Sequence, residues 1–355
     1  MILSRVFRGA LFCLLAIVWS GVSGAQSVIL DLPRQSQRAQ LSQRIGITDI
    51  TINYHRPLVN NRKVWDGLVP YGQVWRAGAN ENTTISFSDP VTIEGKPLEK
   101  GTYGLFMIPT ADQWTIIFSR NSTSWGAFTY NQTEDALRVT VKPAATEMHN
   151  TLTYDFDDVQ PNSAVVTMAW EKVAVPFKVA VDVHEVVQAS MKKQLRGLGQ
   201  YTWEGWDEGA NYLLGEKVAL DDALNYANKS IGVEDRYDNE LTKSKVLAAL
   251  NRKDEAAMAE KKALDLASPL QIHLYARGLQ GGKRNEEAFA IFRENAKKHP
   301  DQWFVHTGLA RMYCGQGKFD DATKEMKVAL ASAPENQKTY LDGLVKKLET
   351  KQDIN

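Results

Sequence analysis

The chain of 355 residues is too long for one ordinary domain and suits two, each with room for a core of its own. Lysine and arginine total 42, and so do aspartate and glutamate, so the formal charge is zero. A neutral chain gives no reason to expect nucleic acid or an anionic membrane surface as a partner.

The first 25 residues have the pattern of a cleaved secretory signal. Arg5 and Arg8 form a basic start, "ALFCLLAIV" is an apolar stretch too short to span a bilayer, and Ser23 to Ala25 offer a small-residue cleavage site. We therefore expect cleavage near Ala25, which removes residues 1–25. The mature protein would be periplasmic or secreted, two destinations that share this signal. A membrane anchor kept in the mature protein is the alternative.

Removal of this segment leaves 40 basic and 42 acidic residues and a single cysteine, Cys314. An internal disulfide is then impossible, so stability outside the cytoplasm must come from the apolar cores. A lone cysteine in an apolar helical context is more often buried than reactive, and we expect Cys314 to be buried.

Residues 26–183 form the first predicted domain, and their apolar side chains recur at every second position. The alternating stretches include Ile50, Ile52 and Tyr54, then Ile85 and Phe87, and later Leu137, Val139 and Val141. Turn signals such as "SDP", "PTADQ" and "VQPNS" separate them. Eight to ten short strands with no helical stretch among them predict an antiparallel β-sandwich or jelly-roll domain.

The period becomes helical at residue 184. Residues 184–203 predict an amphipathic connecting helix, with Val187, Met191, Leu195 and Leu198 on one face. Residues 204–355 then repeat: Ala223, Ala256, Ala288 and Ala322 each follow acidic residues, at intervals of 33, 32 and 34.

This period of helix-turn-helix units resembles the tetratricopeptide repeat. The last unit carries the resemblance best, through Leu309, Ala310, Tyr313, Ala322, Met326, Ala329 and Pro334. The segment "DGLVKKLE" resembles the polar helix that caps such an array. In repeat proteins these positions serve packing, so the resemblance implies a protein or peptide partner without identifying it.

Motifs for metal, cofactor or nucleophilic chemistry are incomplete. The segment "HEVVQ" lacks the second histidine of a helical zinc motif, since Gln188 stands in its place, and we predict no metal site. No glycine-rich loop opens a helix after a strand, so we predict no cofactor. The "SMKK" match at Ser190 is expected by chance, and no Gly-x-Ser-x-Gly elbow occurs in the mature chain.

A polar cluster in the first domain is the remaining candidate site. It brings arginines, an amide and a carboxylate near two tryptophans within about thirty residues. Its candidate ligand-binding residues are Tyr54, Arg56, Arg62, Trp65, Trp75, Arg76, Asn80 and Glu81. Arginine guanidinium groups hold anionic oxygen atoms and tryptophan faces stack on rings, so this composition predicts a shallow site for an anionic or sugar-like ligand.

The same region resembles a known bacterial family. The segments "QRIGITDITINYHRP", "VWDGLVPYGQVWRAGANENTTISF", "GKPLEKGTYGLFMIP", "WTIIFSRNSTSWGAFTY" and "DALRVTVKP" follow in order the pattern of the family catalogued as domain of unknown function 2911, over about residues 35–180. That family is exported and predicted to be β-rich, and it has no established activity. Its motif residues carry over as Tyr54, Arg56, Pro57, Arg62, Trp75, Arg76, Gly78, Asn80, Glu81 and Thr83, while His55 and Asn61 depart from it.

A structural interpretation of the cluster competes with the functional one. Arg76 and Glu81 could form a bidentate pair that holds the turn, with Gly78 at a positive φ and Thr83 starting a strand. In that case the carboxylate serves the fold and is withdrawn from any ligand.

Two functions from different classes follow from these patterns. The first is an exported, non-enzymatic binding or adaptor protein whose β domain holds a ligand or envelope component and whose repeats hold a protein partner. The second is an exported hydrolase acting on glycans or peptides, with Glu81 as acid or base, His55 as proton carrier and Arg56 or Arg76 as electrophilic support. The absence of a complete nucleophile or metal motif favours the first.

Overall fold

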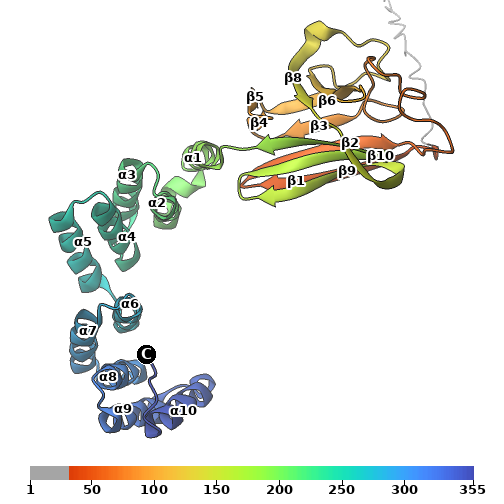
Figure 1. Ribbon diagram of the computed structural model, residues 1–355. Coiled ribbons are helices and arrows are strands. Elements are labelled where there is room, and N and C mark those ends of the chain that lie inside the picture. The colour runs from red at the N-terminus through yellow and green to blue at the C-terminus, as the bar shows by residue number, and fades with distance from the viewer. Residues whose placement is uncertain (1–31) are drawn as a thin grey trace, which may run out of the picture.

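The structure is a computed structural model that describes residues 32–355. The expected signal segment, residues 1–25, lies outside the described residues. An antiparallel β domain comes first and a row of helices follows it (Figure 1). This order confirms the predicted fold class, a β domain followed by a helical repeat array.

The β domain consists of two antiparallel sheets. The six-stranded sheet has the order β1-β2-β3-β6-β7-β8, and the four-stranded sheet has the order β5-β4-β10-β9. The strands are β1 (Gln37–Ile45), β2 (Thr48–Arg56), β3 (Thr84–Phe87), β4 (Val91–Ile93), β5 (Lys96–Leu98), β6 (Gly101–Ile108), β7 (Trp114–Ser119), β8 (Asp135–Val141), β9 (Ala144–Gln160) and β10 (Ser163–Ala180).

The alternation in the sequence decides which face of each strand meets the core. On β2, Ile50, Ile52 and Tyr54 are buried, while Asn53 and His55 lie on the outer face. Apolar residues of both sheets pack face to face in one cluster. The outer face of β2 is therefore the face that can carry functional polar side chains.

Two strands differ from the expectation of short strands. β9 and β10 have 17 and 18 residues and pair along most of their length. Backbone hydrogen bonds between adjacent strands do not require alternating side chains, so the pairing continues where β9 is largely exposed. The register shifts on either side of Glu171, whose φ is 56°, and such bulges let a long ribbon bend over the sandwich.

Ten helices follow the β domain. They are α1 (Val183–Gln194), α2 (Trp203–Glu216), α3 (Leu220–Val233), α4 (Tyr237–Ala249), α5 (Lys253–Leu266), α6 (Pro269–Gly281), α7 (Asn285–Lys298), α8 (Trp303–Gly315), α9 (Phe319–Ser332) and α10 (Glu335–Glu349). Where the sequence predicts one helix over residues 184–203, α1 ends at Gln194 and a short 3-10 turn, η2 (Leu198–Tyr201), precedes α2. Leu198, expected on the apolar face, is 87% exposed.

The repeat pattern reappears as helix geometry. Ala223, Ala256, Ala288 and Ala322 are each the fourth residue of α3, α5, α7 and α9, and all four are buried. Small side chains at these positions let paired helices approach closely, which explains the period. The helices therefore resemble a tetratricopeptide array. No helix among residues 32–355 is long and apolar enough to cross a membrane.

The apolar packing of the array is interrupted once. One pair of linked clusters spans α1 to α5, and another spans α6 to α10. No apolar cluster in residues 32–355 joins α5 to α6. Across this boundary the Tyr275 hydroxyl on α6 donates a hydrogen bond to Glu260 on α5. The segment α6–α10 thus has a core of its own.

Candidate functional site

The residues of the polar cluster belong to β2 and to the segment between β2 and β3. The structure divides these residues between two pockets. Tyr54 and Glu81 line the first pocket, while Arg62, Trp75, Arg76 and Asn80 line the second. Arg56 and Trp65 line neither.

The first pocket is open and has a volume of about 830 Å³. It lies against the outer face of β1 and β2 and is covered by the segment that precedes β1. His55 Nε2 lies 3.3 Å from Glu81 Oε2, and Arg34 Nη1 lies 2.5 Å from Glu81 Oε1. Arg38, which pairs with His55 across the strands, adds another positive charge to the wall.

The predicted pair between Arg76 and Glu81 is wrong. Glu81 forms an ion pair with Arg34 and lies close to His55, and no ion pair of Arg76 occurs within residues 32–355. The turn between them contains two residues with positive φ, Ala77 at 51° and Asn80 at 55°, a conformation that residues other than glycine seldom adopt.

Gly78 also has a different role from the predicted one. It is not among the residues with positive φ, and its lack of a side chain is required by a close approach. A Cβ at Gly78 would lie 2.5 Å from Thr83 Oγ1, which donates a hydrogen bond to the Ala77 carbonyl at 3.1 Å. β3 begins one residue later, at Thr84. The turn is therefore braced by Thr83 and leaves Arg76 uninvolved.

Electrostatics in the first pocket set the charge states of His55 and Glu81. Desolvation lowers the pKa of His55, and Arg34, Arg38 and Arg76 lower it further, while Glu81 opposes them. Desolvation raises the pKa of Glu81, but a backbone hydrogen bond and Arg34 outweigh it and leave the pKa below its ordinary value. At neutral pH the pair thus consists of a neutral imidazole and a carboxylate.

The second pocket is smaller, about 310 Å³, and is lined by aromatic and basic side chains. Trp75 and Trp170 stack with their ring centroids 6.0 Å apart, and both line the pocket. Asn80 Nδ2 donates to the Ser36 carbonyl at 3.2 Å, and Ser36 borders both pockets. The segment before β1 thus lies between the two.

Hydrogen bonding separates the three arginines of the cluster into two roles. Arg56 Nε donates to the Leu152 carbonyl at 3.0 Å, and Arg62 donates to the Leu58 and Val59 carbonyls at 2.5 and 3.0 Å. These two side chains hold loops in place. Arg76 has no side-chain hydrogen bond within residues 32–355, and its Nε is buried without an acceptor.

The aromatic members of the cluster are mostly structural. Trp65 is 7% exposed and meets Trp75, Trp114 and Trp170 edge to face, with centroid distances of 5.8, 4.9 and 5.7 Å. Tyr54 is 5% exposed, and its hydroxyl accepts a hydrogen bond from the Tyr154 backbone N–H at 3.2 Å. Of the two predicted tryptophans, only Trp75 reaches a pocket wall.

The structure adds an exposed aromatic pair that the sequence reasoning missed. Trp125 and Phe128 are 58% and 81% exposed and stack at 6.5 Å with an interplanar angle of 14°. The Arg76 guanidinium carbon lies 5.8 Å from the Trp125 ring centre. Two aromatic residues within a loop of small and polar residues, "NSTSWGAF", are the signal that could have indicated this platform.

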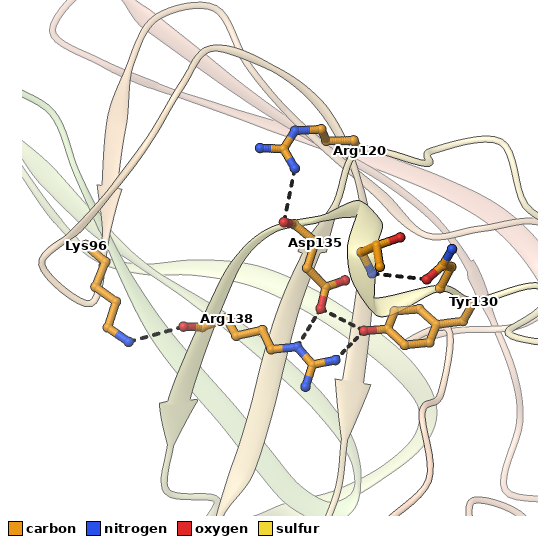
Figure 2. A network of polar contacts seen from close by, with 7 residues as sticks. Lys96, Arg120, Tyr130, Asp135 and Arg138 are labelled. Carbon is orange, nitrogen blue, oxygen red and sulfur yellow. Dashed lines mark hydrogen bonds and ion pairs between the residues drawn. The ribbon is translucent and has the colours of Figure 1, made fainter.

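A polar network holds the far end of the loop that carries these aromatic residues. Asp135 Oδ2 accepts hydrogen bonds from the Tyr130 hydroxyl at 2.7 Å and from Arg138 Nε at 2.5 Å, as Figure 2 shows. Arg120 Nη1 donates to the Asp135 carbonyl at 3.1 Å, and Lys96 donates to that of Arg138. Asp135 is nearly buried, so the network anchors the loop to β8.

Cys314 is buried, as predicted, and is a free thiol. Within residues 32–355, no three histidine, cysteine, aspartate or glutamate side chains come together in an arrangement that could hold a metal ion.

The fold and these pockets define a protein of two parts, a β-sandwich with polar pockets at one end and a tetratricopeptide-like helical array. Residues 36–179 match the model of the family described as "Protein of unknown function (DUF2911)", so the β part is a DUF2911 domain. No curated protein matches the chain.

Several solved structures show limited similarity to the chain. YrrB, a TPR protein described as having an unusual peptide-binding site, has 13% identity and a TM-score of 0.28, with 45% of this chain and 84% of YrrB covered. A MamA mutant has 12% identity and a TM-score of 0.26, with 43% and 94% covered. Yeast Tom70 has 12% identity and a TM-score of 0.26, with 45% and 42% covered. The pairing of the helices and the spacing of their buried alanines define them as a repeat array.

Proposed function

We propose that the protein is an exported ligand-binding adaptor. Its β domain binds a small anionic, sugar-like ligand at the pocket bordered by Arg76, and its helical array binds a protein partner. The signal pattern in residues 1–25 supports a periplasmic or secreted location for this activity.

The observation that carries the ligand proposal is a pair of donors without acceptors. Arg76 Nε and Trp170 Nε1 are both buried, both residues border the second pocket, and neither atom has a hydrogen-bond partner within residues 32–355. Buried polar groups are normally paired, and a buried donor without an acceptor is costly. Desolvation already lowers the pKa of Arg76. A carboxylate in the pocket would supply the missing acceptors.

The exposed aromatic pair supports a ligand with a ring. Trp125 and Phe128 offer flat apolar faces beside the Arg76 guanidinium. A sugar ring can lie on such a face while its acidic group meets the arginine, and the two contacts together specify an acidic sugar better than either alone.

The helical array supports the adaptor half of the proposal. Its recurrent alanines, Ala223, Ala256, Ala288 and Ala322, are buried, so they build a scaffold and leave the outer surfaces for recognition. Affinity capture from the native envelope tests this half. Full-length protein should retain partners that a chain ending at Ala180, shown to be folded by circular dichroism, loses.

Titration calorimetry tests the ligand half of the proposal with a defined probe. Oligogalacturonate, a carboxylated oligosaccharide, should bind the full-length protein, and a neutral galactan oligosaccharide of equal length should bind at least tenfold more weakly. Equal affinity for the two would contradict an anion-recognising pocket. The affinity for oligogalacturonate should also fall with added salt, since charge attraction contributes to it.

A hydrolase acting on glycans or peptides is the second candidate, and one observation favours it: His55 and Glu81 lie 3.3 Å apart in an open pocket. The arginines predicted as electrophilic support are not at this pocket, because Arg56 holds a loop and Arg76 borders the other pocket. Arg34 and Arg38 lie beside His55 and Glu81 instead. A general acid needs a raised pKa, whereas that of Glu81 is lowered. Neutral His55 is the better candidate, as a base.

Hydrolysis is tested by incubating the protein with oligogalacturonate and measuring new reducing ends. A hydrolase would lose this activity in His55→Gln, whereas an adaptor would show none even before substitution. Glu81 is the only carboxylate among the residues that line the first pocket, so the paired carboxylates of a glycosidase are not found there.

A further inference from the structure

The last residues of the chain fold back onto the helical array. Arg311 on α8 donates a hydrogen bond from Nη1 to the Ile354 carbonyl, and Asn355 Nδ2 donates to the Arg311 carbonyl at 3.3 Å. Gln280 on α6 donates to Asn355 Oδ1 at 2.9 Å. Figure 1 shows this end of the chain beside α8, after it leaves α10.

Each of the three tail residues, Asp353, Ile354 and Asn355, has a distinct partner. Ile354 is 8% exposed and joins the apolar cluster of α8, α9 and α10. Asp353 Oδ1 accepts from Cys314 Sγ at 3.2 Å and from the Asn355 backbone N–H at 3.0 Å. The contacts thus recognise an acidic, an aliphatic and an amide side chain in order, within a segment that has no regular secondary structure.

The surface under the tail contains two arginines, Arg277 and Arg311, that form no ion pair within residues 32–355. Arg311 is 7% exposed, and its other side-chain hydrogen bond within residues 32–355 goes to the Tyr340 hydroxyl at 3.3 Å. Arg277 donates to Gln280 Oε1 at 2.7 Å. A buried guanidinium attracts an acidic group strongly. The tail meets this charge with the Ile354 carbonyl, which is bonded to Arg311, and with the Asp353 carboxylate, which is bonded to Cys314.

We propose that the surface formed by Gln280, Arg311, Cys314 and Tyr340 is a peptide-binding site of the array, and that residues 353–355 occupy it as a ligand in cis. A partner would present an extended segment with an acidic, an aliphatic and an amide residue in sequence, and it would displace the tail. This inference rests on the proposed binding of a protein partner by the helices. It adds the site, the partner's chemistry and a built-in competitor.

The probe for this site is a fluorescent peptide of the sequence "TKQDIN", residues 350–355, with a scrambled peptide as control. In fluorescence anisotropy, the full chain should bind the peptide weakly, because the tail is present at a high local concentration. The double variant Asp353→Ala, Ile354→Ser should bind it at least tenfold more tightly. Adding Arg311→Gln to that variant should abolish the gain.

A separate variant guards against loss of folding. If the double variant melts early, Asn355→Ala removes the amide contacts and keeps Ile354 in the apolar cluster, and it should still increase peptide affinity. A folded, tail-disrupted variant that binds the peptide no better than the intact chain would overturn the proposal. So would an intact chain that is dimeric through its tail, since the tail of a second copy would then be the occupant.

The outcomes separate this inference from the proposed adaptor function. If envelope partners are captured through the helices but the peptide neither binds nor competes with them, the tail site is wrong and the adaptor function stands. If the peptide binds and no envelope protein is captured in either form of the chain, the adaptor function fails while the site remains.

Discussion

Arg34 Nη1 lies 2.5 Å from Glu81 Oε1 and joins the segment before β1 to the loop before β3. Arg34 and the nearby His55 thus reach the Glu81 carboxylate from outside its own turn. Arg76 is consequently left without a carboxylate partner within residues 32–355, although only five positions separate it from Glu81. The pairing therefore accounts for the free cation on which the proposed ligand site depends.

Two substitutions that remove charges of opposite sign near His55 should move its pKa in opposite directions. Glu81→Gln removes the group that raises the pKa of His55, so the pKa should fall further below its ordinary value. Arg38→Gln removes a group that lowers it, so the pKa should rise. Titration of the His55 ring signals by isotope-edited NMR measures both changes. Shifts of the same sign in both variants would contradict the geometry of the first pocket.

Glu81→Gln should have only a small effect on folding. The Arg34 and Glu81 side chains are 42% and 47% exposed, and exposed ion pairs of this kind contribute about 0–1 kcal/mol. Denaturant unfolding of the wild type and the variant at neutral pH checks this. A loss of several kcal/mol would show that Glu81 is a central brace of the fold, as the rejected pairing with Arg76 would have implied.

Two tryptophans should respond differently to truncation. Trp65→Ala leaves a large cavity among three other tryptophans and should cost about 3–5 kcal/mol of unfolding free energy. Trp125→Ala removes an exposed ring and should change stability by about 0.5 kcal/mol or less, while weakening oligogalacturonate binding. Denaturant unfolding and calorimetry measure the two effects. The reverse pattern would mean that Trp65 contacts the ligand.

His273 should make the segment α6–α10 sensitive to acid. It is 7% exposed on α6, and desolvation, then Arg277 and Arg311, lower its pKa to about 4. Between pH 6.5 and pH 4 the unfolded chain therefore binds the proton more strongly, so stability falls as pH falls through this window. The full loss is about 3 kcal/mol, at 1.4 kcal/mol per pKa unit.

The variant His273→Phe keeps an aromatic ring beside Phe292 and Phe304 and removes the titration. Unfolding followed by far-ultraviolet circular dichroism should then depend less on pH than in the wild type. His299→Gln, at the end of α7, is the control for the loss of a histidine outside this aromatic cluster. An unchanged pH dependence in His273→Phe would remove His273 as its source.

The features that the sequence predicts are those set by local periodicity. Alternation places Ile50, Ile52 and Tyr54 in the core, and the recurrent alanines identify the helix pairs. Both signals depend on side chains within one element and its immediate neighbour. For the same reason the order of the two parts of the chain is readable from the change of period alone.

The site could be predicted only in part because its contacts join distant segments. Arg34 meets Glu81 from 47 residues away, and Arg56 is occupied by a carbonyl 96 residues along the chain. No local pattern distinguishes these arginines from Arg76. The sequence therefore indicates the region of the candidate site. Only the fold distinguishes Arg56 and Arg62, which hold loops, from Arg76, whose buried Nε has no acceptor.

The most direct test of the ligand site compares Arg76→Gln with Arg62→Gln in calorimetric titrations with oligogalacturonate. Both variants lose one positive charge at the second pocket, but only Arg76 has a buried Nε without an acceptor, whereas Arg62 is bonded to loop carbonyls. We predict that Arg76→Gln weakens binding at least tenfold and that Arg62→Gln changes it less than threefold. Equal losses in the two variants, or no loss in Arg76→Gln, would contradict the proposed site.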